Sequence, residues 1–322
     1  LADALAERGA VCALAVNEAA ARWVPKLLRS RHERRVCEGV DAPSPWTGPA
    51  DVLVCDHYDF AADEERALAA GAHRLAVIDD LADRPHACAL LIDHNASRKL
   101  DDYAGLVPED CVTLAGARYA LIDPAFAAAG AARTPPTALS RVFVSMGLTD
   151  VGAITRRVAD ALAGAAERLD HPLAVDFAIG PYAPSRAHVE ALAEARHGWR
   201  VHVDAQDLPT LMARADLAIG AAGGGALERC AAGLPSLIVA VADNQLALAE
   251  ALNTRGAAMR LPAEEGFEAA LERALGQLGA APAMLRVMSE AARKVCDGHG
   301  AARAADAILA LASGDPERAR QL

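Results

Sequence analysis

The sequence predicts an α/β protein built from two Rossmann-like, doubly wound domains that face a cleft. Three features predict this class: short apolar runs that end in polar residues, helical patterns rich in Ala, Leu, Glu and Arg between those runs, and a single interruption of the alternation. The chain has 322 residues, of which 53% are hydrophobic and 23% charged, so it is long enough for two domains that each bury a core.

The apolar runs divide into two series along the chain. The first series lies at 11–16, 51–56, 74–80 and 88–95. The second series lies at 141–147, 173–180, 200–205, 216–222 and 235–241. Such short runs, separated by helical patterns, are typical of strands in parallel sheets.

The interruption lies at 127–140, where small residues precede Pro135 and Pro136. A Pro-Pro pair cannot continue a helix and favours an extended connector. We therefore predict an N-terminal domain at 1–132, a C-terminal domain at 138–313 and a flexible tail at 314–322.

Composition excludes several classes of function. The formal net charge of -11, without a Lys/Arg cluster, argues against a nucleic-acid partner, and no lysine follows a glycine loop as a P-loop NTPase requires. Seven cysteines without a Cys-x-x-Cys pair indicate reduced thiols in a cytoplasmic protein. No signal peptide or apolar run of membrane-spanning length is recognisable, and the oligomeric state stays unknown.

A glycine-rich segment at 218–245 is the strongest functional signal. It predicts a buried strand, a loop in which Gly223 and Gly224 let backbone amides approach a ligand, and a short helix that attracts an anion. A diphosphate suits such a site. Glu228, in the first turn of that helix, could accept hydrogen bonds from two ribose hydroxyls, and Asn244 and Gln245 would project toward a sugar.

Two other interpretations of this segment stay open. Gly223 and Gly225, with Asp243 after the next strand, imitate a dinucleotide-binding fingerprint, but its third glycine would fall at Glu228. Alternatively, the glycines only shape a tight turn and Glu228 caps its own helix.

A second loop follows the first strand of the C-terminal domain. Gly147, Thr149 and Asp150 stand at the carboxyl end of that strand and directly before a helix, where open α/β sheets bind ligands. Asp150 could equally be a helix N-cap.

Polar residues also end the strands of the N-terminal domain. Asp56, His57 and Tyr58 follow one strand, but neighbours on an extended chain point to opposite faces and cannot form a catalytic triad. Asp79-Asp80 and Asp93-His94-Asn95 follow the next two strands. Paired carboxylates could suggest a metal, yet no complete ligand set is legible, so we predict no metal site.

Taken together, the motifs resemble one known family over nearly the whole chain. In order, they are DHY, IDD, YAGLVPEDC, LAGARYALIDPAF, VSMGLTD, AIGAAGGGALERCAAGLPSLIVAVADNQ and DGHGAARAADAI. This succession resembles the UDP-2,4-diacetamido-2,4,6-trideoxy-β-L-altropyranose hydrolases of pseudaminic acid biosynthesis, a route to surface polysaccharides and flagellin glycosylation. The resemblance implies the glycosyltransferase-B (GT-B) fold and hydrolysis of a UDP-sugar at the anomeric carbon with inversion, without a metal or cofactor.

The resemblance also implies roles for individual residues. It makes Glu228 the ribose-binding glutamate, and places Gly223 and Gly224 beside the diphosphate. Tyr58 matches the active-site tyrosine of the family, and Asn244 with Gln245 matches its Asn-Gln pair at the sugar. Gly147, Thr149 and Asp150 match a Gly-Gly-Thr-Asp loop, although Leu148 replaces the second glycine and puts close backbone approach there in doubt.

The chain departs from the family at its start. Family members open with a strand and a Gly-x-Gly-His-x-x-Arg loop whose histidine is the proposed base, whereas this sequence begins inside the helix that follows. We therefore expect a longer natural protein, and an unpaired gap in the sheet without that strand. A UDP-sugar glycosyltransferase of the same fold and a non-catalytic nucleotide-sugar-binding fragment are the alternative functions.

Overall fold

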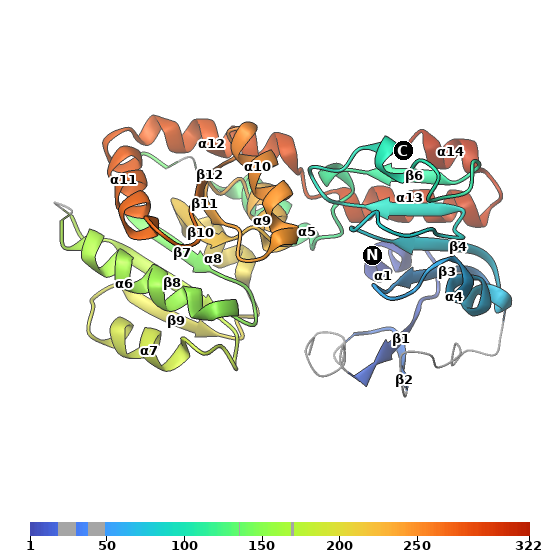
Figure 1. Cartoon of the computed structure of the whole chain (residues 1–322), viewed down its shortest axis with the longest axis horizontal. Helices are drawn as coiled ribbons and strands as arrows, with labels where there is room; N and C mark the ends of the chain where they lie inside the picture. Colours follow the sequence, from blue (N-terminus) through green and yellow to red (C-terminus); the bar gives the residue numbers. More distant parts are fainter. Residues whose placement is uncertain (19–29, 38–48, 135, 169–170) are drawn as a thin grey trace. The chain divides into compact units, whose positions relative to one another are not determined.

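The computed structural model describes residues 1–18, 30–37, 49–134, 136–168 and 171–322. It confirms the predicted α/β class, with parallel strands that alternate with helices (Figure 1). The strands are β1 (Ala13–Asn17), β2 (Glu33–Cys37), β3 (Ala50–Asp56), β4 (Ala72–Ile78), β5 (Leu90–Asp93), β6 (Val112–Ala115), β7 (Arg141–Ser145), β8 (Ala174–Ile179), β9 (Trp199–Val203), β10 (Leu217–Ala221), β11 (Ser236–Val239) and β12 (Ala258–Leu261). The helices are α1 (Ala2–Ala6), α4 (Ala62–Leu68), α5 (Pro124–Ala132), α6 (Ile154–Ala166), α7 (Arg186–Glu194), α8 (Leu208–Arg214), α9 (Gly225–Ala231), α10 (Leu246–Thr254), α11 (Phe267–Ala280), α12 (Pro282–Val295), α13 (Gly300–Ala312) and α14 (Pro316–Arg320).

The chain forms two compact units. Unit 1 comprises Leu1–Leu121 and Gly300–Leu322, and unit 2 comprises Ile122–His299. Each unit has its own parallel strands and its own buried clusters of apolar side chains.

The strands of unit 1 fall into two separate sheets. β1 pairs with β2, and β3, β4, β5 and β6 form a four-stranded sheet in chain order. Among the residues that the structure describes, β1 and β3 therefore share no ladder. On the four-stranded sheet, alternate residues enter different cores: Ala76, Leu90 and Ile92 pack with α13, whereas Val77 and Leu91 pack with Tyr103.

Unit 2 contains a six-stranded parallel sheet in the order β12-β11-β10-β7-β8-β9. The chain builds from β7 outward to β9, returns to the other side of β7 with β10, and continues outward to β12. The order therefore reverses between β7 and β10, and the crevice at such a switch point is where open α/β sheets bind ligands.

The first domain boundary lies elsewhere than the sequence predicts. The predicted N-terminal domain ended at residue 132, but the division falls after Leu121, so α5 belongs to unit 2. The reason is close packing: a Cβ on Gly130 of α5 would lie 2.5 Å from the carbonyl oxygen of Ala231 in α9. Phe126 of α5 is buried as well.

The division into units also differs from the prediction at residue 313, because unit 2 ends at His299. α13 returns to unit 1, where its buried face of Ala304, Ala305, Ile308 and Leu311 covers the four-stranded sheet. The periodicity of a helix shows that one face is buried but not which sheet covers it.

The segment 314–322, for which the sequence predicts a flexible tail, contains the short helix α14. Asp315 caps α14 by accepting a hydrogen bond from the amide of Arg318 at 3.0 Å, and Ala319 is buried. Arg320 Nη2 donates to the carbonyl oxygen of Asp110 at 2.9 Å, which ties the tail to unit 1.

The described part of the chain has no helix that is both long and apolar enough to span a membrane. None of the seven cysteines, all of which lie in the described ranges, forms a disulfide.

The assignment of α13 to unit 1 predicts where a core truncation acts. Ile308→Ala is expected to cost about 2–5 kcal/mol of unfolding free energy, because a buried side chain leaves a cavity. Hydrogen-exchange mass spectrometry should show faster exchange in β4 and β5 and unchanged exchange in β7–β12. Leu278→Ala in the core of unit 2 is the matched control and should give the reverse pattern. Faster exchange of unit 2 in Ile308→Ala would contradict the assignment.

Candidate active site

The two glycine-containing loops predicted from sequence both lie at the switch point of unit 2. The loop at 146–150 follows β7 and the loop at 222–224 follows β10, and these two strands are paired neighbours. Because the strands are parallel, both loops leave the sheet at its carboxyl edge.

Asp150 holds the loop after β7. It is 1% exposed and adopts a left-handed conformation with φ of 47°. Its carboxylate accepts hydrogen bonds from the amide and hydroxyl of Thr155, at 2.9 and 2.6 Å, and from the amide of Ser185 at 3.3 Å. Both carboxylate oxygens therefore have protein partners, which supports the helix-capping interpretation of Asp150. Direct ligand contact by Asp150 stays a prediction.

The neighbours of Asp150 leave the surface of this loop open. Gly147 has φ of +97°, which favours glycine, and a Cβ there would meet nothing within 4 Å. Thr149 is exposed. Leu148 lies against Gly180, where a Cβ would come within 1.8 Å of the Leu148 carbonyl oxygen, so its backbone is held from one side.

The backbone conformation of the loop after β10 does not require glycine at Gly223 or Gly224. Neither Gly223 nor Gly224 has a positive φ, so their role is not to shape a left-handed turn. A Cβ on Gly224 would meet nothing within 4 Å, and the nearest atom to a Cβ on Gly223 is Nε2 of Gln245 at 3.5 Å. These glycines leave space above the loop, which a ligand can occupy.

The backbone amides of this loop are available as donors. In the part of the chain that the structure describes, the amides of Gly223 and Gly224 have no hydrogen-bond acceptor, whereas their carbonyls accept from Ala226 and Leu227. Amides that are free at a loop open to solvent can bind phosphate oxygens.

Gln245, Asn244 and Glu228 lie around the same loop. Gln245 Oε1 accepts a hydrogen bond from the Val241 amide at 3.1 Å, which holds the side chain beside Gly223. Asn244 is exposed in the short 3₁₀ helix Asp243–Gln245. Glu228 is partly buried, and its Oε2 lies 3.7 Å from the position of a Cβ on Gly225, so the carboxylate turns back over the first turn of α9.

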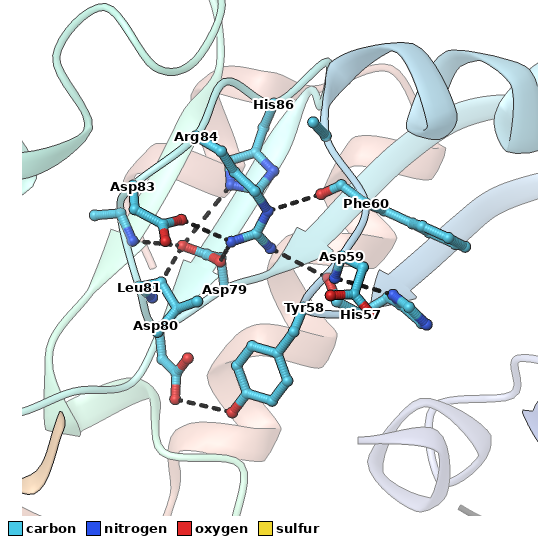
Figure 2. Close-up of polar contacts among 12 residues, drawn as sticks. His57, Tyr58, Asp59, Phe60, Asp79, Asp80, Leu81, Asp83, Arg84 and His86 are labelled. Carbon is cyan, nitrogen blue, oxygen red and sulfur yellow. Dashed lines mark hydrogen bonds and ion pairs between the residues drawn. The ribbon is translucent and has the colours of Figure 1, made fainter. Parts of the chain in front are cut away.

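In unit 1, Tyr58 lies at the carboxyl edge of the four-stranded sheet (Figure 2). It is 64% exposed and its hydroxyl donates a hydrogen bond to Asp80 Oδ2 at 3.4 Å. Partial burial and then the negative charges of Asp80 and Asp56 raise the pKa of Tyr58 above its usual value. Tyr58 is therefore protonated at neutral pH and serves as a hydrogen-bond donor.

Sequence reasoning missed Arg84, which holds the loop that carries Tyr58. Arg84 Nε donates to the Phe60 carbonyl at 2.8 Å and Nη2 to the His57 carbonyl at 3.1 Å (Figure 2). These two acceptors lie on either side of Tyr58 in the sequence. Its Nη1 lies 2.9 Å from Asp79 Oδ1. No sequence signal marks Arg84, because it comes from a connection without regular structure.

Asp79 and Asp93 are structural members of a buried network. The Tyr103 hydroxyl lies 2.8 Å from Asp79 Oδ2 and 2.9 Å from Asp93 Oδ2, and Asp93 also pairs with Arg98. Asp79 and Asp93 are thus held by protein groups on the face of the sheet that carries Tyr103. Among the described residues, no three His, Cys, Asp or Glu side chains are arranged to hold a metal ion.

His86 balances two buried carboxylates of this network. Its Nδ1 lies 2.6 Å from Glu65 Oε1, and its Nε2 lies 3.7 Å from Asp79 Oδ2, which is too long for a hydrogen bond. Burial alone would lower the pKa of His86, but its contacts with Asp79 and Glu65 raise that pKa to about 9. Burial alone would raise the pKa of Asp79, but the hydrogen-bond donors and the Arg84 charge around it hold the pKa of that carboxyl well below its usual range.

Two curated proteins are similar in sequence to about half of this chain. Over 164 residues the chain is 27% identical to the UDP-2,4-diacetamido-2,4,6-trideoxy-beta-L-altropyranose hydrolase of Campylobacter jejuni, a match that covers 50% of this chain and 56% of that protein. Over 160 residues it is 36% identical to the UDP-N-acetylglucosamine–N-acetylmuramyl-(pentapeptide) pyrophosphoryl-undecaprenol N-acetylglucosamine transferase of Xanthomonas campestris, covering 48% of this chain and 37% of that enzyme. No family model matches the chain.

The fold has a close counterpart among solved structures. The calicheamicin glycosyltransferase CalG4 superposes with a TM-score of 0.61 over 96% of this chain and 94% of its own, at 18% identity. The predicted GT-B fold is confirmed, and so is the resemblance to the hydrolase, over half of the chain. The matched segments span only about one third to one half of the two curated relatives.

The buried ion pairs of His86 predict a loss of stability at high pH. Because its pKa is raised from 6.5 to about 9, the charged ring contributes fully below about pH 6.5, and this contribution disappears as the pH rises through about 9. Between pH 7 and 10 we expect a loss on the order of 3 kcal/mol from this group in urea unfolding. His86→Gln should lack that part of the pH dependence, whereas His188→Gln, which removes a partly exposed histidine of unit 2, should keep it. Equal slopes in wild type and His86→Gln would contradict the assignment.

Proposed function

We propose that this protein hydrolyses a UDP-linked deoxy-diacetamido sugar, UDP-2,4-diacetamido-2,4,6-trideoxy-β-L-altropyranose, in pseudaminic acid biosynthesis. The reaction attacks the anomeric carbon and releases UDP and the free sugar. The observation that carries the proposal is the open glycine loop with free amides at the switch point of unit 2. The match to a hydrolase of that name supports the substrate.

The residues of unit 2 have distinct roles in holding UDP. The amides of Gly223 and Gly224 donate to the diphosphate, and the loop of Gly147 and Thr149 lies beside it, with Asp150 fixing that loop from below. Glu228 accepts hydrogen bonds from the ribose hydroxyls. Gln245 and Asn244 extend from the end of β11 toward the sugar.

The proposed reaction does not require a strong general acid. UDP leaves as an anion that loop amides can stabilise, so the leaving oxygen needs no proton. What remains is to orient a water molecule against the anomeric carbon as positive charge develops on the ring. Tyr58 is a neutral hydrogen-bond donor and Asn244 is an exposed amide, and either kind of group can orient a sugar hydroxyl or a water molecule. We assign the proton of the water to none of these residues.

A glycosyltransferase is the second candidate, because the transferase of Xanthomonas campestris matches at higher identity over a similar length. The two functions separate in one experiment: the UDP-sugar is incubated in H₂¹⁸O without an acceptor. A hydrolase releases UDP and puts ¹⁸O on the sugar, because the sugar C–O bond breaks. A transferase releases no free sugar, and a binding protein shows UDP affinity without turnover. Either result would overturn the proposed hydrolysis.

Glu228→Ala tests the ribose contact. The substitution is expected to weaken UDP binding by about 1–3 kcal/mol, the range for losing a charged hydrogen-bond partner. Isothermal titration calorimetry with UDP measures the change. Glu272→Ala, which removes an exposed carboxylate of unit 2, is the control and should bind as wild type does. Unchanged affinity in Glu228→Ala would refute the role.

Tyr58→Phe tests the contribution of unit 1. Removal of the hydroxyl is expected to lower kcat by about tenfold or more, while the affinity for UDP stays the same, since the hydroxyl acts on the sugar or water. Asp80→Asn, which replaces the acceptor of the Tyr58 hydrogen bond, should give a smaller loss of the same kind. Steady-state UDP release measures kcat, and a wild-type kcat in Tyr58→Phe would exclude the assignment.

A further inference from the structure

Arg229 is a buried cation directly behind the glycine loop of unit 2. It belongs to α9 and is 2% exposed, and its side chain runs back toward the start of the helix. Its Nη2 donates a hydrogen bond at 2.7 Å to the carbonyl oxygen of Ala221, the last residue of β10. The loop of Gly223 and Gly224 begins two residues later.

The backbone around the guanidinium is shaped to admit it. A Cβ on Gly220 would lie 2.5 Å from Nη1 and 2.7 Å from Cζ of Arg229, so only glycine fits at that position of β10. Gly220 pairs with Ser145 at the end of β7, which places the guanidinium at the switch point between the two central strands. A Cβ on Gly225 would come 3.5 Å from Nη1, so the charge lies close to the loop on its inner side.

Arg229 has few partners for a buried charge. Within the described residues, it forms no ion pair with a carboxylate, although the negative charge of the neighbouring Glu228 favours its charged form, and its buried Nε has no hydrogen-bond acceptor. Burial lowers the pKa of Arg229 to about 10, so the side chain is charged at neutral pH. A buried charge of this kind is costly unless a counterion approaches it.

A second buried arginine of unit 2 gives the contrast. Arg133 also has a pKa lowered to about 10 by burial and an Nε without an acceptor. Its guanidinium, however, donates to the carbonyl oxygens of Gly233, Ala215 and Asp216. Because Ala215 and Asp216 precede β10, Arg133 lies at the opposite end of the strand from the glycine loop. The two residues differ in position and in the number of acceptors.

We propose that Arg229 is a positioning residue that provides the positive charge for a nucleoside diphosphate at the glycine loop, from behind the backbone and without contact with the ligand. It also fixes the carbonyl at the base of the loop, so that the amides of Gly223 and Gly224 face outward. The unpaired amides at the start of α9 carry only a partial positive charge, about half an elementary charge, so the full charge of Arg229 adds to their attraction for the phosphates. This inference rests on the proposed UDP site.

The experiment compares UDP, UMP and uridine by calorimetry on the full chain. Arg229→Met should lower UDP affinity by about tenfold or more, UMP affinity less, and uridine affinity by less than about twofold, because the effect follows ligand charge. Arg133→Met is the matched control and should bind all three ligands as wild type does, whatever its loss of thermal stability.

Arg229→Lys keeps the charge and adds a readout that a structural role would not change. Buried lysines have lowered pKa values, so the UDP affinity of this variant should be near wild type at pH 7 and fall as the pH rises toward 9, while wild type stays constant. This variant decides the question if Arg229→Met does not fold.

Equal losses of uridine and UDP affinity, or a Lys variant without pH dependence, would overturn the inference. If wild type and Arg229→Met bind UDP with equal affinity, this inference alone is overturned. Wild type that fails to bind UDP would overturn the proposed function as well.

Discussion

Parallel pairing of strands is the constraint on which the rest of the structure depends. In a parallel sheet all strands run in one direction, so the loops that leave their carboxyl ends meet at one edge. In unit 2 this brings together the loops after β7 and β10, about 75 residues apart in sequence, at the point where the strand order reverses. In unit 1 the same rule gathers the loops after β3 and β4, which carry Tyr58 and Asp80.

The two edges handle buried charge in different ways. In unit 1, Asp79 forms ion pairs with Arg84 and His86 and accepts a hydrogen bond from Tyr103, so positive charges of the protein balance its negative charge. Arg84 of this network also donates to the carbonyl oxygens of His57 and Phe60, and these hydrogen bonds fix the backbone from which the exposed Tyr58 extends. In unit 2, Arg229 has no comparable set of partners among the residues that the structure describes, and its charge lies behind a loop whose amides have no acceptor within those residues. In unit 1 the buried charges are balanced within the protein, whereas in unit 2 we propose that an anionic ligand balances the charge of Arg229.

Much of this could be predicted from sequence because it depends on local pattern. Short apolar runs predict the strands, and glycines next to them predict the two loops, since both signals lie within a few residues. The domain division could not be predicted, because the helical pattern of α13 indicates a buried face but not which sheet covers it. The Pro135–Pro136 pair favours a boundary at that point of the sequence, whereas unit 2 begins at Ile122. Arg84 and Arg229 were missed for a related reason. A surface arginine and a buried one have the same letter, and only the fold shows that Gly220 makes room for the guanidinium of Arg229.

The position at which the diphosphate of UDP binds is the central prediction for this protein. A crystal of the full chain soaked with UDP tests this most directly. We predict electron density for the two phosphates within hydrogen-bonding distance of the Gly223 and Gly224 amides, with the ribose next to Glu228. Density for the nucleotide at any other place, or a vacant loop after β10 at saturating UDP, would contradict it.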